Sequence, residues 1–131
     1  MPTGGRYFLD TNIVIALFSH DPKVVARLET TPEVFLSFVV LGELHFGAAN
    51  SSRRQENTAQ VEDFAASCTL VPVDEPAARC FGEMKAELRR KGRPIPENDL
   101  WLAASATAHG LTLVTRDAHF GEVDVLAIET W

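Results

Sequence analysis

Short, wholly apolar segments alternate with helix-length segments along almost the entire chain. The segments at residues 7–9 and 111–114 are apolar at nearly every position, which is typical of strands covered on both faces. Strands that alternate with helices build a parallel sheet with helices packed against it. The sequence therefore predicts an α/β sandwich with a mostly parallel central sheet.

Capping and turn residues divide the chain further. Asp21-Pro22 and Asp74 are suited to begin helices, and Gly110 is suited to end one. No repeat and no linker interrupts the pattern, so we expect a single domain over residues 1–131. We place strands at 6–9, 34–37, 69–73, 111–115 and 125–128, and helices at 11–19, 22–30, 39–50, 52–67, 75–91 and 98–109.

Charge and cysteine content narrow the functional class. The 18 acidic residues outnumber the 12 basic ones, which argues against a generic basic coat for nucleic acid but leaves a local basic patch open. Two cysteines, Cys68 and Cys80, make no disulfide framework and suit a reducing compartment. The sequence has no apolar leader and no stretch long enough to cross a bilayer. We therefore expect a soluble, cytoplasmic protein with no membrane partner.

Four acidic residues occupy positions where an ordinary fold does not need them. Asp10 ends the first predicted strand, and Asp117 lies just beyond the fourth. Both therefore lie at the carboxyl edge of a parallel sheet, where the active sites of such folds are found. Glu43 projects from a helix face without polar neighbours, and Asp99 lies in the first turn of a largely apolar helix.

Taken singly, these acids have structural explanations. Asp10 suits a helix cap, Asp99 suits a helix N-terminus and Asp117 suits a turn. If all four converge, their mutual repulsion has to be offset by a cation. An oxygen-only cluster favours a hard cation, Mg²⁺ or Mn²⁺, and such an ion is suited to phosphate chemistry.

Hydroxyl and amide side chains flank the four acids along the sequence. They are candidates for orienting the carboxylates or a metal-bound water, and ordinary capping and turn bonding is the alternative. The candidates are Thr11, Asn12, Ser37, Asn98 and Thr115.

Four motifs in this order resemble PIN-domain ribonucleases, and within them the VapC toxins of type II toxin–antitoxin pairs. The motifs are LDTN at residues 9–12, SFVVLGEL at 37–44, PENDLWLAA at 96–104 and LVTRDAHF at 113–120. Each motif alone is weak, whereas the ordered set is specific. The resemblance implies a PIN-like three-layer α/β/α sandwich with about five short strands.

The same resemblance implies a Mg²⁺- or Mn²⁺-dependent endoribonuclease that cleaves RNA, tRNA before other RNAs, by metal-activated water. Asp10, Glu43 and Asp99 match the family's three core acids, and Asp117 matches a fourth position that is acidic in some members. His119 stands where many relatives carry an acid, so we expect it to serve the surface or packing and not a metal. The implied partners are a VapB-like antitoxin, which inserts a segment into the acidic pocket, and a second copy of the chain in a homodimer. Phe18 and Phe46 are candidates for the antitoxin surface, with a core role as the alternative.

Phosphate contacts need cations, and residues 85–93 contain five basic side chains and one acid. We therefore expect RNA contacts here and next to Asp117, although a solvated helix end is an equally good explanation of the cluster. The candidate RNA-binding residues are Arg89, Arg90, Lys91, Arg93 and Arg116.

Two other interpretations stay open. An aspartyl-phosphate phosphatase requires a second Asp two residues after its nucleophile, where this chain has Asn12. A receiver domain requires an Asp at the end of its central strand, and Asp74 is the one candidate after the middle strand of this chain. A PIN-like module that only binds RNA or a protein, without catalysis, is the non-enzymatic alternative. The intact set of four acids argues against that module.

Overall fold

The computed structural model describes residues 5–131 of the chain. Its strands are β1 (Tyr7–Leu9), β2 (Val34–Ser37), β3 (Thr69–Val71), β4 (Thr112–Val114) and β5 (Ile128–Glu129). Its α-helices are α1 (Thr11–Phe18), α2 (Pro22–Glu29), α3 (Phe38–Ala49), α4 (Arg54–Ala66), α5 (Glu75–Lys91) and α6 (Glu97–Ala108). A short 3₁₀ helix, η1 (Ala118–Glu122), lies between β4 and β5.

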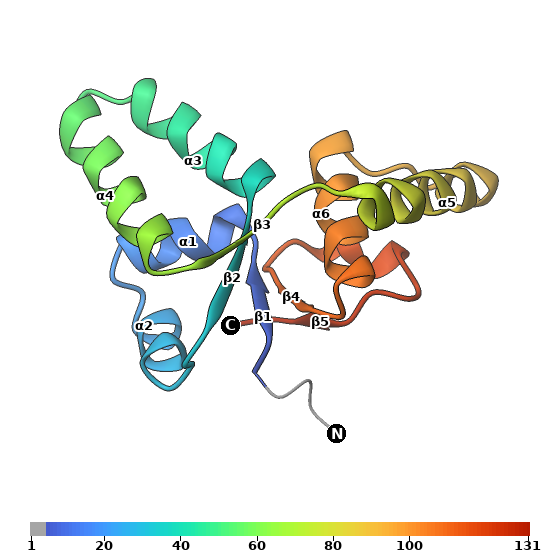
Figure 1. The fold of residues 1–131 in the computed structure, drawn as a ribbon, viewed down its shortest axis with the longest axis horizontal. Coiled ribbons are helices and arrows are strands. Elements are labelled where there is room, and N and C mark those ends of the chain that lie inside the picture. Colours follow the sequence, from blue (N-terminus) through green and yellow to red (C-terminus); the bar gives the residue numbers. More distant parts are fainter. Residues whose placement is uncertain (1–4) are drawn as a thin grey trace.

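The strands form one parallel sheet in the order β3-β2-β1-β4-β5. Figure 1 shows α1 and α2 on one side of this sheet, α5 and α6 on the other, and the α3–α4 hairpin reaching out from the carboxyl ends of the strands. The predicted α/β/α sandwich with a parallel sheet is confirmed. Because β1 lies between β2 and β4, the segments that follow these three strands meet at one edge of the sheet.

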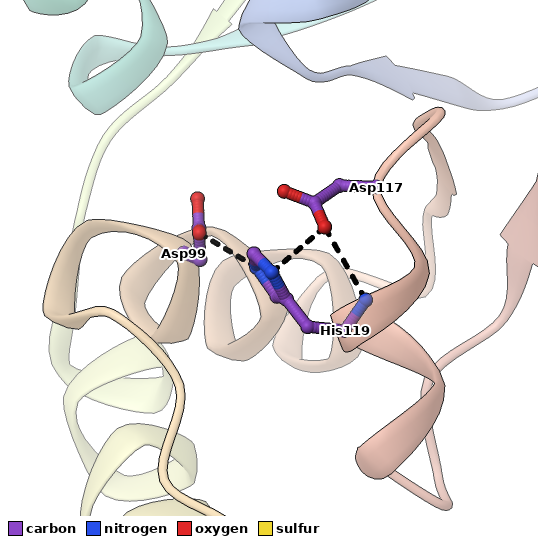
Figure 2. Close-up of side chains that lie close together, drawn as sticks. All are labelled: Asp99, Asp117 and His119. Carbon is purple, nitrogen blue, oxygen red and sulfur yellow. Dashed lines mark hydrogen bonds and ion pairs between the residues drawn. The ribbon is translucent and has the colours of Figure 1, made fainter.

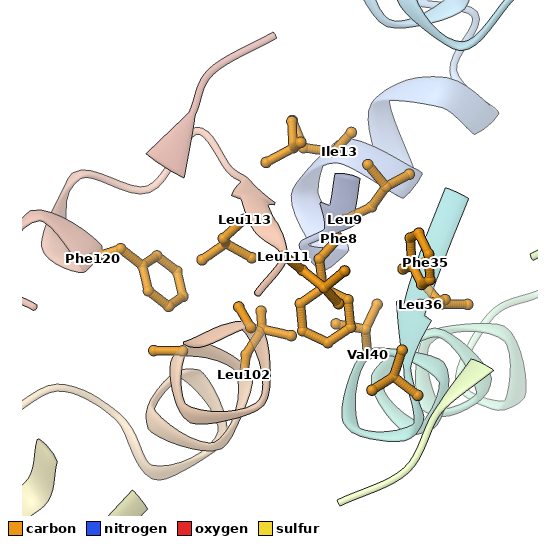
Figure 3. Close-up of a cluster of buried hydrophobic side chains, with 14 of the residues drawn as sticks. Phe8, Leu9, Ile13, Phe35, Leu36, Val40, Leu102, Leu111, Leu113 and Phe120 are labelled. Atoms are coloured by element: carbon orange, nitrogen blue, oxygen red, sulfur yellow. The ribbon is translucent and has the colours of Figure 1, made fainter. Parts of the chain in front are cut away.

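The core lies on both faces of β1. Successive strand side chains point to opposite faces, and Figure 3 shows Leu9 next to Ile13 of α1 while Phe8 points towards Leu102 of α6. All four side chains are essentially inaccessible to solvent. Full burial of one such side chain contributes roughly 1.5–3 kcal/mol to stability, so the packing holds the carboxyl end of β1 in a fixed position.

Near the C-terminus one predicted strand is misplaced and one short helix was not predicted. The predicted strand at 125–128 begins only at Ile128, where it pairs with Leu113. Val125 is 71% exposed and lies in a loop, because η1 and the turn after it take up the chain that an earlier strand would need. The helix η1 itself was not predicted, and its first turn is capped by the carboxylate of Asp117, which accepts a hydrogen bond from the backbone N–H of His119.

Within residues 5–131, no helix has the length and apolar character needed to cross a membrane.

Candidate active site

Asp10 is the buried centre of the site. It directly follows β1, and its backbone N–H donates to the carbonyl of Val114 at 2.9 Å, so the β1–β4 ladder extends to this residue. Its Oδ1 accepts from the backbone N–H of Thr11 at 2.7 Å, which also caps α1. Its Oδ2 accepts from the hydroxyl of Thr115 at 2.7 Å. Only 5% of Asp10 is exposed, and these contacts hold its carboxylate in one orientation.

Glu43 reaches the same edge of the sheet from α3. Its Oε1 accepts a hydrogen bond from the hydroxyl of Thr11 at 2.9 Å, so Thr11 connects the N-terminus of α1 to α3. Glu43 is half-buried. The apolar helix face noted in the sequence is buried only in part: Val40 is buried, whereas Phe46 is 71% exposed.

Asp99, Asp117 and His119 form a second group next to Asp10. Figure 2 shows the imidazole of His119 between the two carboxylates, one from the first turn of α6 and one from the loop before η1. His119 Nε2 lies 2.7 Å from Asp99 Oδ2, and His119 Nδ1 lies 2.7 Å from Asp117 Oδ1. The three side chains offer ligand atoms that all lie within 4.8 Å of one another.

Electrostatics join the two groups into one site. Burial raises the pKa of the Asp10 carboxyl above its ordinary value of 3.8, hydrogen bonds from Thr115 and Thr11 oppose this, and the charges of Asp99 and Asp117 raise it further. Burial likewise raises the pKa of Glu43, opposed by the Thr11 hydrogen bond and reinforced by the charges of Asp10 and Asp99. The charges of Asp99 and Asp117 therefore act on Asp10, and those of Asp10 and Asp99 act on Glu43, at the same edge of the sheet.

Across residues 5–131, no lysine or arginine forms an ion pair with any of these four carboxylates. Clustered acids without such a partner repel one another. Oxygen-rich sites of this kind are those that hold Mg²⁺ or Mn²⁺ in proteins. The donor set therefore fits a hard divalent cation.

Three of the five predicted orienting residues touch the acids. Thr115 donates to Asp10, and its hydroxyl oxygen accepts from the backbone N–H of Asp117 at 3.0 Å and from Asn12 at 3.4 Å. Asn12 also donates to Asp10 Oδ2 at 3.3 Å, and Thr11 contacts both Asp10 and Glu43.

The other two orienting residues have different surroundings. The Ser37 hydroxyl caps α3 by accepting from the backbone N–H of Val39 at 3.0 Å. Asn98 is exposed in the first turn of α6, and none of the hydrogen bonds among the described residues joins it to an acid.

Most of the predicted RNA-binding cations are paired with acids. Lys91 contacts Asp124 at 2.9 Å, Arg93 contacts Glu122 at 3.4 Å, and Arg90 is paired with Glu87. Of the candidates in this cluster, only Arg89 forms no ion pair with a described residue.

Arg116 follows Thr115, but its guanidinium forms no ion pair with the four site acids and binds elsewhere. Its Nη2 donates to Asp21 Oδ2 at 3.0 Å, and its Nε donates to the carbonyl of Trp131 at 2.8 Å. Arg116 thus ties the start of α2 to the C-terminal residue.

His119 is the site residue that the sequence prediction missed. The ring is partly exposed and packs against Phe120, as a surface or packing role predicts, and it also contacts two of the four acids, which was not predicted. The available signal was local: His119 follows Asp117 by two residues and precedes the fully buried Phe120. A buried neighbour and a capped turn fix where the ring points.

Comparison with known proteins agrees with this geometry. The family model described as PIN domain matches residues 7–126. The chain is 36% identical over 129 residues to a Haemophilus influenzae protein named Ribonuclease VapC2, covering 96% of this chain and 98% of that protein. It is 33% identical over 129 residues to a Shigella flexneri protein named tRNA(fMet)-specific endonuclease VapC, with the same coverage of both chains.

Solved structures give the same result for the fold. The chain superimposes with a TM-score of 0.91 on a chain of DNA-bound VapBC from Salmonella typhimurium, at 30% identity, covering 96% of this chain and 98% of that one. A chain of VapBC2 from Rickettsia felis, bound to a DNA fragment from its promoter, gives a TM-score of 0.90 at 30% identity, covering 95% of this chain and 98% of that one.

Proposed function

The chain belongs to the PIN domain family, and we propose that it is a divalent-metal-dependent endoribonuclease of the VapC type. The observation that carries this proposal is the group of carboxylates at the carboxyl edge of the sheet, none of which forms an ion pair with a lysine or arginine of residues 5–131. Burial raises the pKa values of Asp10 and Glu43, and the charges of other acids in the same group raise them further.

In this proposal Asp10, Glu43, Asp99 and Asp117 hold Mg²⁺ or Mn²⁺. When bound, the ion supplies an activated water and neutralises the charge that develops on the scissile phosphate. The protein's own part is to hold the carboxylates in place: Thr115 and Asn12 fix Asp10, and Thr11 fixes Glu43. Such outer hydrogen bonds set the orientation of metal ligands.

We assign the chain the role of a toxin whose partner is a VapB-like antitoxin. Its relatives are named VapC, and the solved structures that it superimposes on are VapBC assemblies. A groove between α1, α3 and α4 leads to Glu43 and is lined by Ile15 and Phe18, with Phe46 on the exposed surface of α3. Phe46 is 71% exposed and Ile15 is 54% exposed, whereas Phe18 packs edge-on against Phe64. We expect an apolar antitoxin segment to occupy this groove.

We further propose that the substrate is tRNA, that the protein acts in the cytoplasm, and that it forms a homodimer. The Shigella flexneri relative is named for cleavage of tRNA(fMet). The single-stranded loops of an RNA present unstacked bases, through which proteins recognise RNA sequence.

Expression in a bacterial host without the antitoxin tests this function. We expect growth arrest, and sequencing of RNA 5′ ends should map discrete cuts within tRNA. Asp99→Asn, at equal protein level, should remove both effects, and co-expression of a cognate VapB-like antitoxin should relieve the arrest. Arrest that persists in Asp99→Asn without RNA cuts would instead point to a binding module.

A further inference from the structure

The ring of His119 distinguishes this site from one built only of oxygen ligands. It lies between Asp99 and Asp117, with one ring nitrogen facing each carboxylate at 2.7 Å (Figure 2). Two ligands that bind one ion at right angles lie about 3 Å apart, given metal–ligand distances of about 2.1 Å. The contact between His119 and Asp99, a hydrogen bond in this structure, is close to the spacing of two neighbouring ligands of one ion.

Two local contacts fix the position of the His119 ring. The N–H of His119 donates to Asp117 Oδ1 at 3.3 Å, which caps η1. The next side chain, Phe120, is fully buried, and its ring centroid lies 4.9 Å from that of His119. The imidazole is nevertheless partly exposed, so an ion can reach it from solvent.

The two ring nitrogens suit two different tasks. A histidine that binds a metal through one nitrogen commonly donates its other N–H to a carboxylate, which fixes the orientation of the ring. Here Nε2 faces Asp99 in α6, and Nδ1 faces Asp117 in the loop that carries η1. Asp117 is the more exposed of the two acids, and its Oδ1 faces the ring, which leaves its second carboxylate oxygen for the ion.

We propose that His119 is a nitrogen ligand of the active-site ion: Nε2 binds the ion beside Asp99, Nδ1–H donates to Asp117, and the nitrogen makes the site prefer Mn²⁺ to Mg²⁺. Both ions bind carboxylates, but Mg²⁺ strongly favours oxygen ligands, whereas Mn²⁺ is a first-row transition-metal ion that also accepts an imidazole nitrogen. This inference rests on the proposed metal-dependent function and adds the identity of a ligand and of the ion class.

Pulsed electron paramagnetic resonance of the Mn²⁺-loaded protein tests the ligand directly, because a nitrogen bound to Mn²⁺ produces a ¹⁴N hyperfine coupling. We expect this coupling in the wild type and its loss in His119→Ala and His119→Gln. The glutamine side chain can still donate to a carboxylate but offers no imidazole nitrogen. His109→Ala is the matched control. His109 follows α6 at the end opposite to Asp99, and its Nε2 lies 3.0 Å from Asp74, which precedes α5. This variant should keep the coupling.

Calorimetric titration with Mn²⁺ and with Mg²⁺ gives the second readout. The ratio of Mn²⁺ to Mg²⁺ affinity should fall by about tenfold or more in both His119 variants and stay unchanged in His109→Ala. Circular dichroism checks that each variant is folded.

The outcomes separate this inference from the proposed function. Wild-type protein that binds Mn²⁺ and cleaves RNA without a ¹⁴N coupling would overturn the ligand assignment and leave the nuclease standing. An unchanged affinity ratio in folded His119→Gln would overturn the preference for Mn²⁺. Protein that binds neither ion would contradict the proposed function itself.

Discussion

Among single residues, Thr115 links most of the site through the hydrogen bonds of its hydroxyl group. Its hydroxyl donates to Asp10 and accepts from Asp117 and Asn12, so both the donor and the two acceptor positions of the oxygen are used. The four acids could be predicted from sequence because each is locally out of place, at a strand end or on an apolar helix face. The contact of His119 with Asp99 could not, because it depends on how η1 packs against α6.

Thr115→Val replaces this hydroxyl with a methyl group of similar size. Asp10 then loses a fixed donor, and we expect the divalent-ion affinity or the cleavage rate to fall by about 10–100-fold. Ser37→Ala is the contrast, because the Ser37 hydroxyl caps α3 and touches no acid. It should cost about 1 kcal/mol in the free energy of unfolding and leave cleavage unchanged. Equal loss of cleavage in both variants would contradict the assignment.

Asp10 and Glu43 also predict a pH dependence of stability. Burial raises both pKa values above their ordinary 3.8 and 4.5, so the folded protein binds these protons more tightly than the unfolded chain does. The contribution to stability is fully present below the ordinary values and is lost as pH rises through the raised ones. Urea unfolding in EDTA should therefore show the wild type losing stability, relative to Asp10→Asn, as pH increases through this window.

The difference between wild type and Asp10→Asn is the quantity to follow, because Asp21 and Asp74 have lowered pKa values and act in the opposite direction in both proteins. Mn²⁺ or Mg²⁺ should restore the wild type at neutral pH and have little effect on the variant. A difference that grows in favour of the wild type as pH rises in EDTA would contradict the account.

At the scale of elements, short apolar segments between helices predict β1 to β4 well, because a strand covered on both faces is apolar at nearly every position. It places β5 too early and misses η1, since a two-residue edge strand and a 3₁₀ turn depend on pairing and capping far more than on pattern. The loop after α5 is set by Gly92, which has φ +68° and leads the chain towards Asp99.

Two glycines associated with α5 give a matched test of this loop. A Cβ at Gly92 or at Gly82 would meet no atom within 4 Å, so only backbone conformation separates them. Gly92→Ala should destabilise the protein by about 1 kcal/mol, because alanine is disfavoured at positive φ. Gly82→Ala lies within the helix and should stabilise it by about 0.5–1 kcal/mol. Thermal unfolding of the two variants should show shifts of opposite sign, and shifts of the same sign would contradict the role of Gly92.

For the whole molecule, the property to explain is how an acidic protein binds RNA, which is itself negatively charged. A protein with net charge −6 is proposed to bind RNA at an acidic site, and most of the predicted RNA-binding cations are already paired with acids. A divalent ion would reconcile these facts, since it would offset the carboxylates and attract the phosphate at the same place. The sequence identifies the acids and the deficit of cations, but only the fold shows which cations are engaged.

The central claim is that the four-carboxylate site cleaves RNA with a divalent ion. The most direct measurement is cleavage of total RNA by purified, antitoxin-free protein in Mg²⁺, Mn²⁺ or EDTA, with Asp10→Asn and the exposed α4 variant Asp63→Asn alongside. We predict discrete cuts that need a divalent ion, that persist in Asp63→Asn, and that fall by about 100-fold or more in Asp10→Asn. Equal cleavage by wild type and Asp10→Asn, or cleavage that survives EDTA, would contradict it.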